Sequence, residues 1–299
     1  MSQPQSISLT QSAVKDKLSQ LAVLYKLRLN TFVVFSSLIG YALLADTYNF
    51  ISFFLLGLGG FLVSGAANAF NQIIEKDSDA LMSRTKNRPL PAEKMTIKEA
   101  ILWGGLAAVA GLLILSLYFN TVVGLLSAIS LITYSFIYTP LKTVHPIAVF
   151  VGAIPGALPP MIGAVAASGY LSNTALYLFL IQFIWQFPHF WGIAWVQYDD
   201  YKKANIMLLP SSKGKTLGSA INMFVYTLAL FPLTVLIYSL GYVHLFGFIV
   251  LLIAAGLFIM PSIKLLKNTS DENARKVMFA SFLYLPLALV AILLDNLFF

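Results

Sequence analysis

Hydrophobic residues form long continuous stretches that charged residues interrupt at only a few points. Six stretches lack Asp, Glu, Lys and Arg: residues 29–45, 47–74, 100–141, 143–198, 216–263 and 277–294. Because a helix needs roughly 20 apolar residues to cross a bilayer, the first, second and sixth stretches each predict one crossing. The other three have room for two helices each, with breaks at 120–121, 168–173 and 241–244. The pattern predicts an all-α polytopic membrane protein with nine transmembrane helices, and its continuous apolar runs argue against a closed barrel.

The basic residues give an independent test of this topology. All 19 Lys and Arg residues fall in the N-terminal segment or in the loops after predicted helices two, four, six and eight. They therefore share one face of the membrane, and the positive-inside rule predicts a cytoplasmic N-terminus and a C-terminus outside. Residues 1–23 are expected to form a disordered cytoplasmic tail and residues 24–299 a single membrane domain. The Ser/Gln-rich start lacks the arginines of a transit peptide, which favours a bacterial inner membrane over a mitochondrial one.

Composition narrows the class of protein further. A mean hydropathy of +0.82 and 59% hydrophobic residues exclude an ordinary soluble domain. The net charge of +7 indicates membrane topology and attraction to anionic lipid in the bilayer rather than nucleic-acid binding. The absence of cysteine excludes disulfides, thiolate metal sites and cysteine nucleophiles.

The first candidate site lies at the polar end of the second apolar stretch. Asn71, Glu75 and Asp79 follow one another at intervals of four residues, so a continuing helix would stack them on one face about 6 Å apart. Asp77 would point elsewhere. Stacked oxygen ligands suit Mg²⁺, which takes one or two carboxylates, keeps several waters and completes its shell with substrate phosphates. The pattern predicts a site for a polyanion held through a divalent cation.

A basic segment follows this acidic one. Arg84, Lys86 and Arg88 could hold phosphate oxygens that the metal leaves free, the arginines in bidentate fashion. The alternative is a solvated helix end whose loop bases merely set the orientation in the membrane. A second acidic pair, Asp199 and Asp200, closes the sixth predicted helix on the same membrane face. Two acidic clusters suggest two Mg²⁺ ions around one diphosphate, although an ordinary polar helix end would look the same.

These residues resemble the signature of the UbiA-type intramembrane prenyltransferases. The resemblance covers residues 71–90 and extends to 138–142, 152–163, 185–191 and 199–210. The variant is more similar to the branch that farnesylates protoheme IX than to the quinone-forming branches. The sequence departs from the family pattern in the second motif, which often has two acids four residues apart. Positions 196 and 204 are Val196 and Ala204, so the two acids of this motif are adjacent instead. Which member of the adjacent pair binds metal stays open, with Asp200 favoured.

The resemblance implies a fold, a reaction and a set of site residues. The fold would be nine helices around a central cavity. Farnesyl diphosphate would bind through Mg²⁺, the only cofactor, and an aromatic-shielded allylic cation would be attacked by a vinyl group of heme b. Addition of water would then give heme O, and whether a downstream heme A synthase consumes it stays open. The predicted catalytic residues are Asn71, Glu75, Asp79 and Asp200; the metal ligands are Glu75, Asp79, Asp199 and Asp200; and the diphosphate ligands are Arg84, Lys86, Arg88 and Lys142.

The histidines are candidates for heme contact. His189 lies inside the sixth predicted helix, where an ionisable side chain is a functional candidate by default. It could ligate heme iron or hydrogen-bond a neighbouring helix. His145 could contact heme or cap its loop, whereas His244 falls in a short outer loop with no expected role. Lys142 or Arg28 could meet diphosphate or heme propionates, and Arg28 could equally be a membrane anchor.

Two rival functions remain at this point. The first keeps the prenyl transfer and changes the acceptor to a quinone precursor or chlorophyllide. The second is a transporter or lipid-anion carrier, which would place acids and bases near the midplane of the membrane. Because the charges gather at one face instead, the enzyme is the preferred hypothesis.

Overall fold

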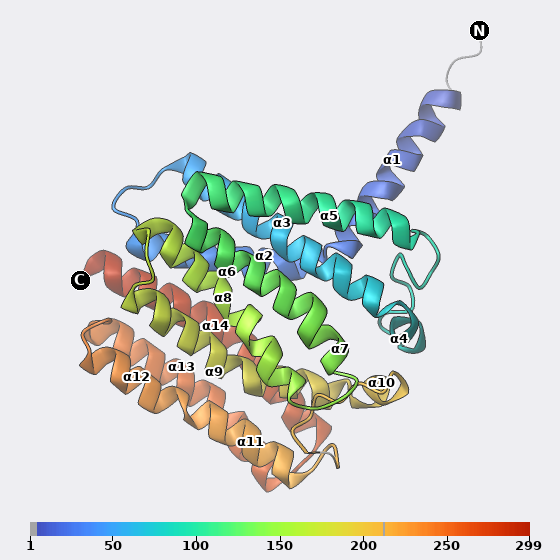
Figure 1. Cartoon of the computed structure of the whole chain (residues 1–299). Helices are drawn as coiled ribbons and strands as arrows, with labels where there is room; N and C mark the ends of the chain where they lie inside the picture. The colour runs from blue at the N-terminus through green and yellow to red at the C-terminus, as the bar shows by residue number, and fades with distance from the viewer. Residues whose placement is uncertain (1–4, 212) are drawn as a thin grey trace.

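The computed structural model describes residues 5–211 and 213–299, which form a helical bundle with no strand (Figure 1). Its first half comprises α1 (Gln5–Leu24), α2 (Leu27–Leu44), α3 (Phe50–Ile74), α4 (Lys76–Leu81), α5 (Ile97–Ile114), α6 (Thr121–Ile132), α7 (Thr139–Leu141) and α8 (Ala148–Ser168). The second half comprises α9 (Asn173–Val196), α10 (Tyr198–Lys203), α11 (Leu217–Leu228), α12 (Leu230–Ser239), α13 (Leu245–Lys267) and α14 (Asp271–Phe298). Two π-helical segments, Leu115–Phe119 and Thr133–Tyr138, extend α5 and α6.

The membrane-spanning helices agree with the sequence pattern. Among the described residues, 8 helical spans are long and apolar enough to cross a bilayer. Helix α9 also has a crossing length of 24 residues, and its lower hydropathy follows from the polar side chains of Gln182, Gln186 and His189. With α9 included, the expected crossings are all present, and the all-α polytopic prediction is confirmed. The chain is a multi-pass membrane protein.

Each predicted break is a local turn or cap. Asn120 begins α6, where its side chain accepts a hydrogen bond from Val123 N at 3.0 Å. Gly169 ends α8 with φ of 81°, and Gly241 follows α12 with φ of 74°, a left-handed conformation that glycine adopts without steric cost. Ser172 caps α9 through its side chain. Within each long uncharged stretch, the two helices are therefore separated by residues that favour a helix end and not by charged residues.

Helix α8 lies at the centre of the bundle and is its most buried crossing, with 14 of its 21 residues buried. It packs against α2 so closely that the two backbones touch. A Cβ atom added to Gly163 would overlap the Ser37 carbonyl oxygen, and one added to Gly40 would overlap the Pro160 carbonyl oxygen. Small residues that allow this approach are typical of helix packing in membranes.

Neighbouring helices satisfy the carbonyl groups that two prolines of α8 leave free. Pro159 and Pro160 have no N–H, so the carbonyls of Pro155 and Gly156 lose their usual donors. The Ser130 hydroxyl donates to Pro155 O at 3.2 Å, and Gln182 Nε2 donates to Gly156 O at 2.6 Å. In this way α6 and α9 complete the hydrogen bonding of the proline-kinked helix.

Gln182→Leu should therefore destabilise the fold. Gly156 O would lose its donor inside the bundle, which we expect to cost about 1–3 kcal/mol of unfolding free energy. Thermal unfolding in detergent measures the change. Asn222→Leu is the matched control, because the Asn222 amide also donates to a carbonyl, Gly218 O, but at an exposed position. Equal unfolding temperatures for the two variants would contradict this account.

Helix α1 differs from the expected tail. The structure gives a helix over Gln5–Leu24 that projects from the bundle (Figure 1), and residues 1–4 of the predicted tail lie outside the described residues. Its C-terminal end is held by Gln72 Nε2, which donates to Leu24 O at 2.7 Å. Lys17 pairs with Glu99 at 2.6 Å. These contacts to α3 and α5 explain the order at the end of α1.

Candidate active site

The helical backbone hydrogen bonds continue almost without a break from α3 into α4, and they align the predicted site residues on one face. Glu75 N donates to Asn71 O at 3.0 Å, and Asp79 N donates to Glu75 O at 2.7 Å. Asn71, Glu75 and Asp79 are buried, with relative exposures of 1%, 6% and 0%. Asp77, as expected, is exposed. The four-residue spacing therefore places these three side chains on one buried face at the C-terminal end of α3.

Asp79 lies against the basic loop. Its Oδ2 atom pairs with Arg88 at 2.6 Å, and Thr85 donates to its carbonyl oxygen at 2.8 Å. The other carboxylate oxygen, Oδ1, is buried and has no hydrogen-bond donor among the described residues. A buried carboxylate oxygen without a partner is costly, and a bound ion is a common explanation for one.

Asn71 and Glu75 contact two lysines from other parts of the chain. Glu75 forms an ion pair with Lys142, which follows α7. Asn71 Oδ1 accepts from Lys26 Nζ at 2.9 Å, and Asn71 Nδ2 donates to Thr139 at 3.0 Å. The predicted diphosphate ligand Lys142 thus lies beside the acidic face.

Lys26 belongs to this cluster although sequence reasoning did not select it. It lies between α1 and α2 in a left-handed conformation with φ of 48°. Arg28, which was considered, is exposed instead. No sequence signal distinguishes the two bases, because their difference arises from the direction in which the chain enters α2.

The charges of the two lysines depend on their surroundings. Burial, together with the nearby Arg88 guanidinium, lowers the pKa of Lys26 to about 7. Burial and the charge of Lys26 also lower the pKa of Lys142 to about 7, whereas its ion pair with Glu75 favours the charged form. Lys26 is therefore charged below neutral pH and largely neutral above it.

A pH profile should report this titration. If Lys26 contacts an anionic substrate, kcat/KM for that substrate should fall by about tenfold as the pH rises through about 7, because only protonated Lys26 attracts the anion. Lys26→Arg should lessen the fall, since arginine stays charged while Lys142 still titrates. Steady-state assays of both proteins from about pH 6 to about pH 9 measure it. Identical profiles would exclude Lys26 as the titrating group.

In the second acidic pair, Asp200 accepts hydrogen bonds from other side chains and Asp199 does not share this environment. Asp200 accepts from Ser83 at 2.6 Å and from Lys203 at 2.8 Å. The Lys203 ammonium, followed by the Ser83 hydroxyl, holds the pKa of the Asp200 carboxyl well below its usual range. Asp199 is exposed. Through Ser83, Asp200 joins α10 to the basic loop that follows α4.

Tyr201 connects the same two regions. Burial raises the pKa of its phenol, and the Arg84 and Arg88 guanidinium groups beside it oppose that rise. Arg84 is exposed apart from this contact, and Lys86 is exposed. Arg88, Lys26 and Lys142 are thus the bases closest to the acidic face, whereas Arg84 lies toward α10.

The acidic residues do not form one compact metal cluster. Within residues 5–211 and 213–299, no group of three or more His, Cys, Asp or Glu side chains lies close enough to share an ion. The donors still fit Mg²⁺, which often takes only one or two protein carboxylates and binds the substrate phosphate as well. Asp79 Oδ1, buried with no donor in the described part of the chain, is an oxygen that such an ion would satisfy.

The histidines lie away from the acidic face. His189 contacts Ser281 of α14 through Nδ1 at 2.8 Å and stacks on Trp185 at 4.4 Å between ring centroids. His145 accepts from Ile147 N at 3.0 Å, which caps the start of α8. At the opposite end of the bundle, Asp295 accepts from the backbone N–H groups of His244 and Gly247 and so holds the start of α13. The structure contains the alternative contact expected for each residue: His189 hydrogen-bonds a neighbouring helix, and His145 caps its loop.

Sequence comparison identifies close relatives over nearly the whole chain. A profile of the UbiA prenyltransferase family matches residues 33–285. The protoheme IX farnesyltransferase of Cytophaga hutchinsonii is 46% identical over 276 residues, covering 92% of this chain and 96% of that protein. The protoheme IX farnesyltransferase of Christiangramia forsetii is 45% identical, covering 93% of this chain and 94% of that protein.

Solved structures share the arrangement of helices. A structure described as digeranylgeranylglyceryl phosphate synthase superposes with a TM-score of 0.77 at 22% identity, covering 94% of this chain and 98% of that one. A UbiA homolog from Archaeoglobus fulgidus, bound to GPP and Mg²⁺, superposes with a TM-score of 0.65 at 13% identity, covering 91% and 99%. At these identities the likeness establishes the fold.

Proposed function

The chain belongs to the UbiA prenyltransferase family, and we propose that it transfers the farnesyl group of farnesyl diphosphate to a vinyl group of protoheme IX, giving heme O. The observation that carries the reaction class is the buried face of Asn71, Glu75 and Asp79, surrounded by Arg88, Lys142 and Lys26. The acceptor is supported by relatives at 46% and 45% identity that are protoheme IX farnesyltransferases.

The bases around this face would bind and orient the diphosphate. Arg88 can offer two parallel N–H donors to phosphate oxygens, and Lys142 and Lys26 add compact positive charge. Arg84 and Lys86 are exposed on the same loop and would take up phosphate oxygens nearer the surface. When the farnesyl C–O bond breaks, these groups stabilise the negative charge that grows on the leaving diphosphate.

The proposed site also includes Mg²⁺. Glu75 and Asp79 would hold one ion, and Asp200, with exposed Asp199 beside it, is the proposed source of ligands for a second. Bound Mg²⁺ would act as a Lewis acid on the leaving diphosphate. The structure of the A. fulgidus relative contains both GPP and Mg²⁺. Without it, the two carboxylates would repel the substrate.

Aromatic side chains would protect the reacting carbon. Tyr134 and Tyr138 lie together on the helix that ends at Lys142, with their ring centroids 5.4 Å apart. Lys142 Nζ lies 5.6 Å from the Tyr138 ring, so this face already accommodates a cation. An allylic cation would be stabilised in the same way, and the surrounding helices would keep bulk water away until the vinyl group attacks.

We further propose a bacterial inner-membrane location, with residues 24–299 as one domain. The clustering of every Lys and Arg at one end supports a cytoplasmic N-terminus and a C-terminus outside. For the proposed heme contacts, Ser281 engages Nδ1 of His189, so iron ligation by that residue would require Nε2. Whether a heme A synthase uses the product is a separate question for cells.

Heme analysis of cells tests the proposed activity. Cells that carry the gene should contain heme O, and cells that lack it should contain protoheme alone. Extraction followed by mass spectrometry distinguishes the two hemes. If removing the gene depletes a prenylated quinone and leaves heme O unchanged, the acceptor assignment is wrong and the rival prenyltransferase is correct.

A further inference from the structure

Thr139 lies at the junction between the second π-helical segment, Thr133–Tyr138, and α7. It is buried and faces Asn71, whose Nδ2 atom donates to Thr139 Oγ1 at 3.0 Å. The Thr139 hydroxyl in turn donates to the carbonyl oxygen of Tyr134 at 2.8 Å. This one hydroxyl therefore connects the buried face of the proposed diphosphate site to the helix that carries Tyr134.

The single proton of this hydroxyl determines how the Asn71 amide is oriented. Because that proton is directed to Tyr134 O, Thr139 Oγ1 can only accept a hydrogen bond from Asn71. The group of Asn71 that faces Thr139 must then be the amide nitrogen, and Oδ1 points the other way, where it accepts from Lys26 Nζ at 2.9 Å. A protonated lysine has only donors, so both ends of the amide require the same orientation.

The π-helical segment brings Thr139 to this position. The Thr139 backbone N–H also donates to Tyr134 O, which lies five residues earlier rather than four. The extra residue in this turn shifts the register of the chain that follows, and such turns occur frequently at functional sites. Tyr134 O consequently has two donors and would keep one if the Thr139 hydroxyl were removed.

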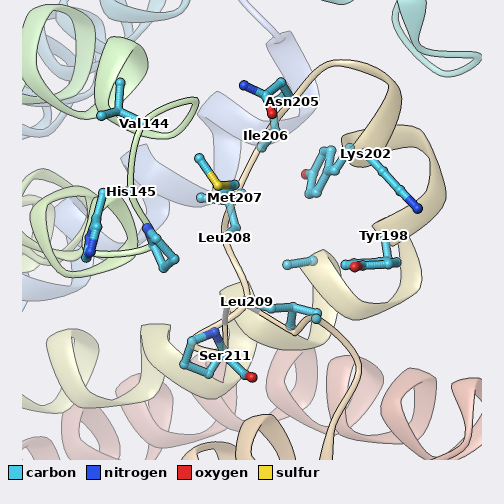
Figure 2. A pocket seen from close by; sticks show the side chains of 15 residues that line it. Val144, His145, Tyr198, Lys202, Asn205, Ile206, Met207, Leu208, Leu209 and Ser211 are labelled. Carbon is cyan, nitrogen blue, oxygen red and sulfur yellow. The ribbon is translucent and has the colours of Figure 1, made fainter.

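Segment 205–211 holds the backbone that follows Thr139. Met207 N donates to Lys142 O at 2.7 Å. Figure 2 shows this segment passing alongside the loop that carries His145. Helix α7 is thus fixed before it by the π-helical segment and after it by this contact. A fixed backbone is what a hydroxyl needs in order to hold one orientation of a neighbouring amide.

We propose that Thr139 is a positioning residue for the diphosphate: its hydroxyl fixes the Asn71 amide so that Oδ1 holds the Lys26 ammonium at the acidic face. This inference rests on the proposed function and deepens it, because Thr139 acts on the prenyl donor only through Asn71 and Lys26. Without the hydroxyl, Asn71 Nδ2 would be buried without its acceptor, and the amide would lose its single preferred orientation. Lys26 would then lose its fixed partner.

Binding of farnesyl thiolodiphosphate, an unreactive analogue of the prenyl donor, tests the proposal without any acceptor. In nanodiscs with Mg²⁺, Thr139→Val should bind this analogue about tenfold more weakly than wild type, because valine keeps the branched shape and removes the acceptor. Thr139→Ser keeps the hydroxyl and should bind within about twofold of wild type. Unchanged binding by folded Thr139→Val would overturn the proposal.

Thr143→Val is the matched control. Thr143 belongs to the same stretch, and its hydroxyl also donates to a backbone carbonyl, Pro140 O at 2.9 Å, but no described hydrogen bond joins it to Asn71. Its replacement should therefore leave binding of the analogue within about twofold of wild type. Equal losses in Thr139→Val and Thr143→Val would show a general effect of hydroxyl removal in this stretch and would contradict a positioning role.

A double-mutant cycle distinguishes positioning from direct contact with the substrate. If Thr139 acts through Asn71, adding Thr139→Val to Asn71→Ala should weaken binding by no more than about twofold further. The double variant also lacks the amide donor that Thr139→Val alone would leave without a partner, so it should unfold close to the temperature of Asn71→Ala. Independent losses that multiply would show another route to the substrate and refute the proposal.

Transfer assays distinguish this inference from the proposed function. Thr139→Val should raise KM for farnesyl diphosphate about tenfold and leave KM for protoheme unchanged, whereas a general structural defect would raise both. If wild type transfers farnesyl to protoheme and Thr139→Val behaves identically, only the positioning role fails. If Thr139→Val binds the analogue weakly as predicted but wild type transfers nothing to protoheme, the positioning role stands and the acceptor assignment fails.

Discussion

Asp79→Asn should lower the rate of farnesyl transfer by about 100- to 1,000-fold, the usual effect of removing one group that stabilises charge in the transition state. The substitution keeps the shape of the side chain and removes the charge that Arg88 and a bound Mg²⁺ would share. Transfer of labelled farnesyl from its diphosphate to protoheme, measured with purified protein, gives the rate. A transporter could retain substrate flux after this change, whereas a metal–diphosphate enzyme should lose turnover.

Asp77→Asn is the matched control for this experiment. Asp77 lies two residues away on the same short helix but is exposed, so the loss of its charge should leave the rate within about twofold of wild type. Because Asp79→Asn also leaves Arg88 without its partner, thermal unfolding of both variants should accompany the assay. Full activity of folded Asp79→Asn would remove Asp79 from the site.

Gly163→Ala should be the most damaging single methyl group that can be added to the bundle. Its Cβ would overlap a backbone oxygen, Ser37 O, which cannot rotate away, so α2 and α8 must separate. We expect a loss of about 3 kcal/mol or more in unfolding free energy, or roughly 10 °C in Tm. Thermal unfolding in detergent measures this effect.

Two other glycines provide the comparison. A Cβ on Gly60 or Gly105 would meet no atom within 4 Å. Gly60→Ala and Gly105→Ala should therefore be neutral or stabilising by up to about 1 kcal/mol, because alanine favours the helix. If Gly163→Ala unfolds at the same temperature as these controls, the close packing of α2 on α8 is not what stabilises the bundle.

The nine crossings could be predicted because a membrane-spanning helix requires a simple sequence pattern. Each crossing requires a long apolar run, and each paired run carries a residue that interrupts the helix, such as Asn120 or Gly169, near its middle. Order in α1 could not be predicted, because it depends on Gln72 and Glu99, which approach from α3 and α5. The composition of the α1 segment itself does not indicate those contacts.

The acidic face was predictable for a similar reason. Four-residue spacing on a continuing helix fixes Asn71, Glu75 and Asp79 on one side regardless of the rest of the fold. The partners of these residues were not predictable, because Lys26 and Lys142 reach them only through tertiary packing. Asp200 accepts a hydrogen bond from Ser83 whereas Asp199 is exposed, and metal binding by either residue stays a prediction.

The most direct test of the central claim is transfer by the purified protein in the presence and absence of a chelator. With labelled farnesyl diphosphate, protoheme and Mg²⁺, we expect a heme product that carries one farnesyl group. Chelation should abolish its formation, and added Mg²⁺ should restore it. Product formation that is indifferent to chelation, or transfer only to a hydroxybenzoate, would contradict the account.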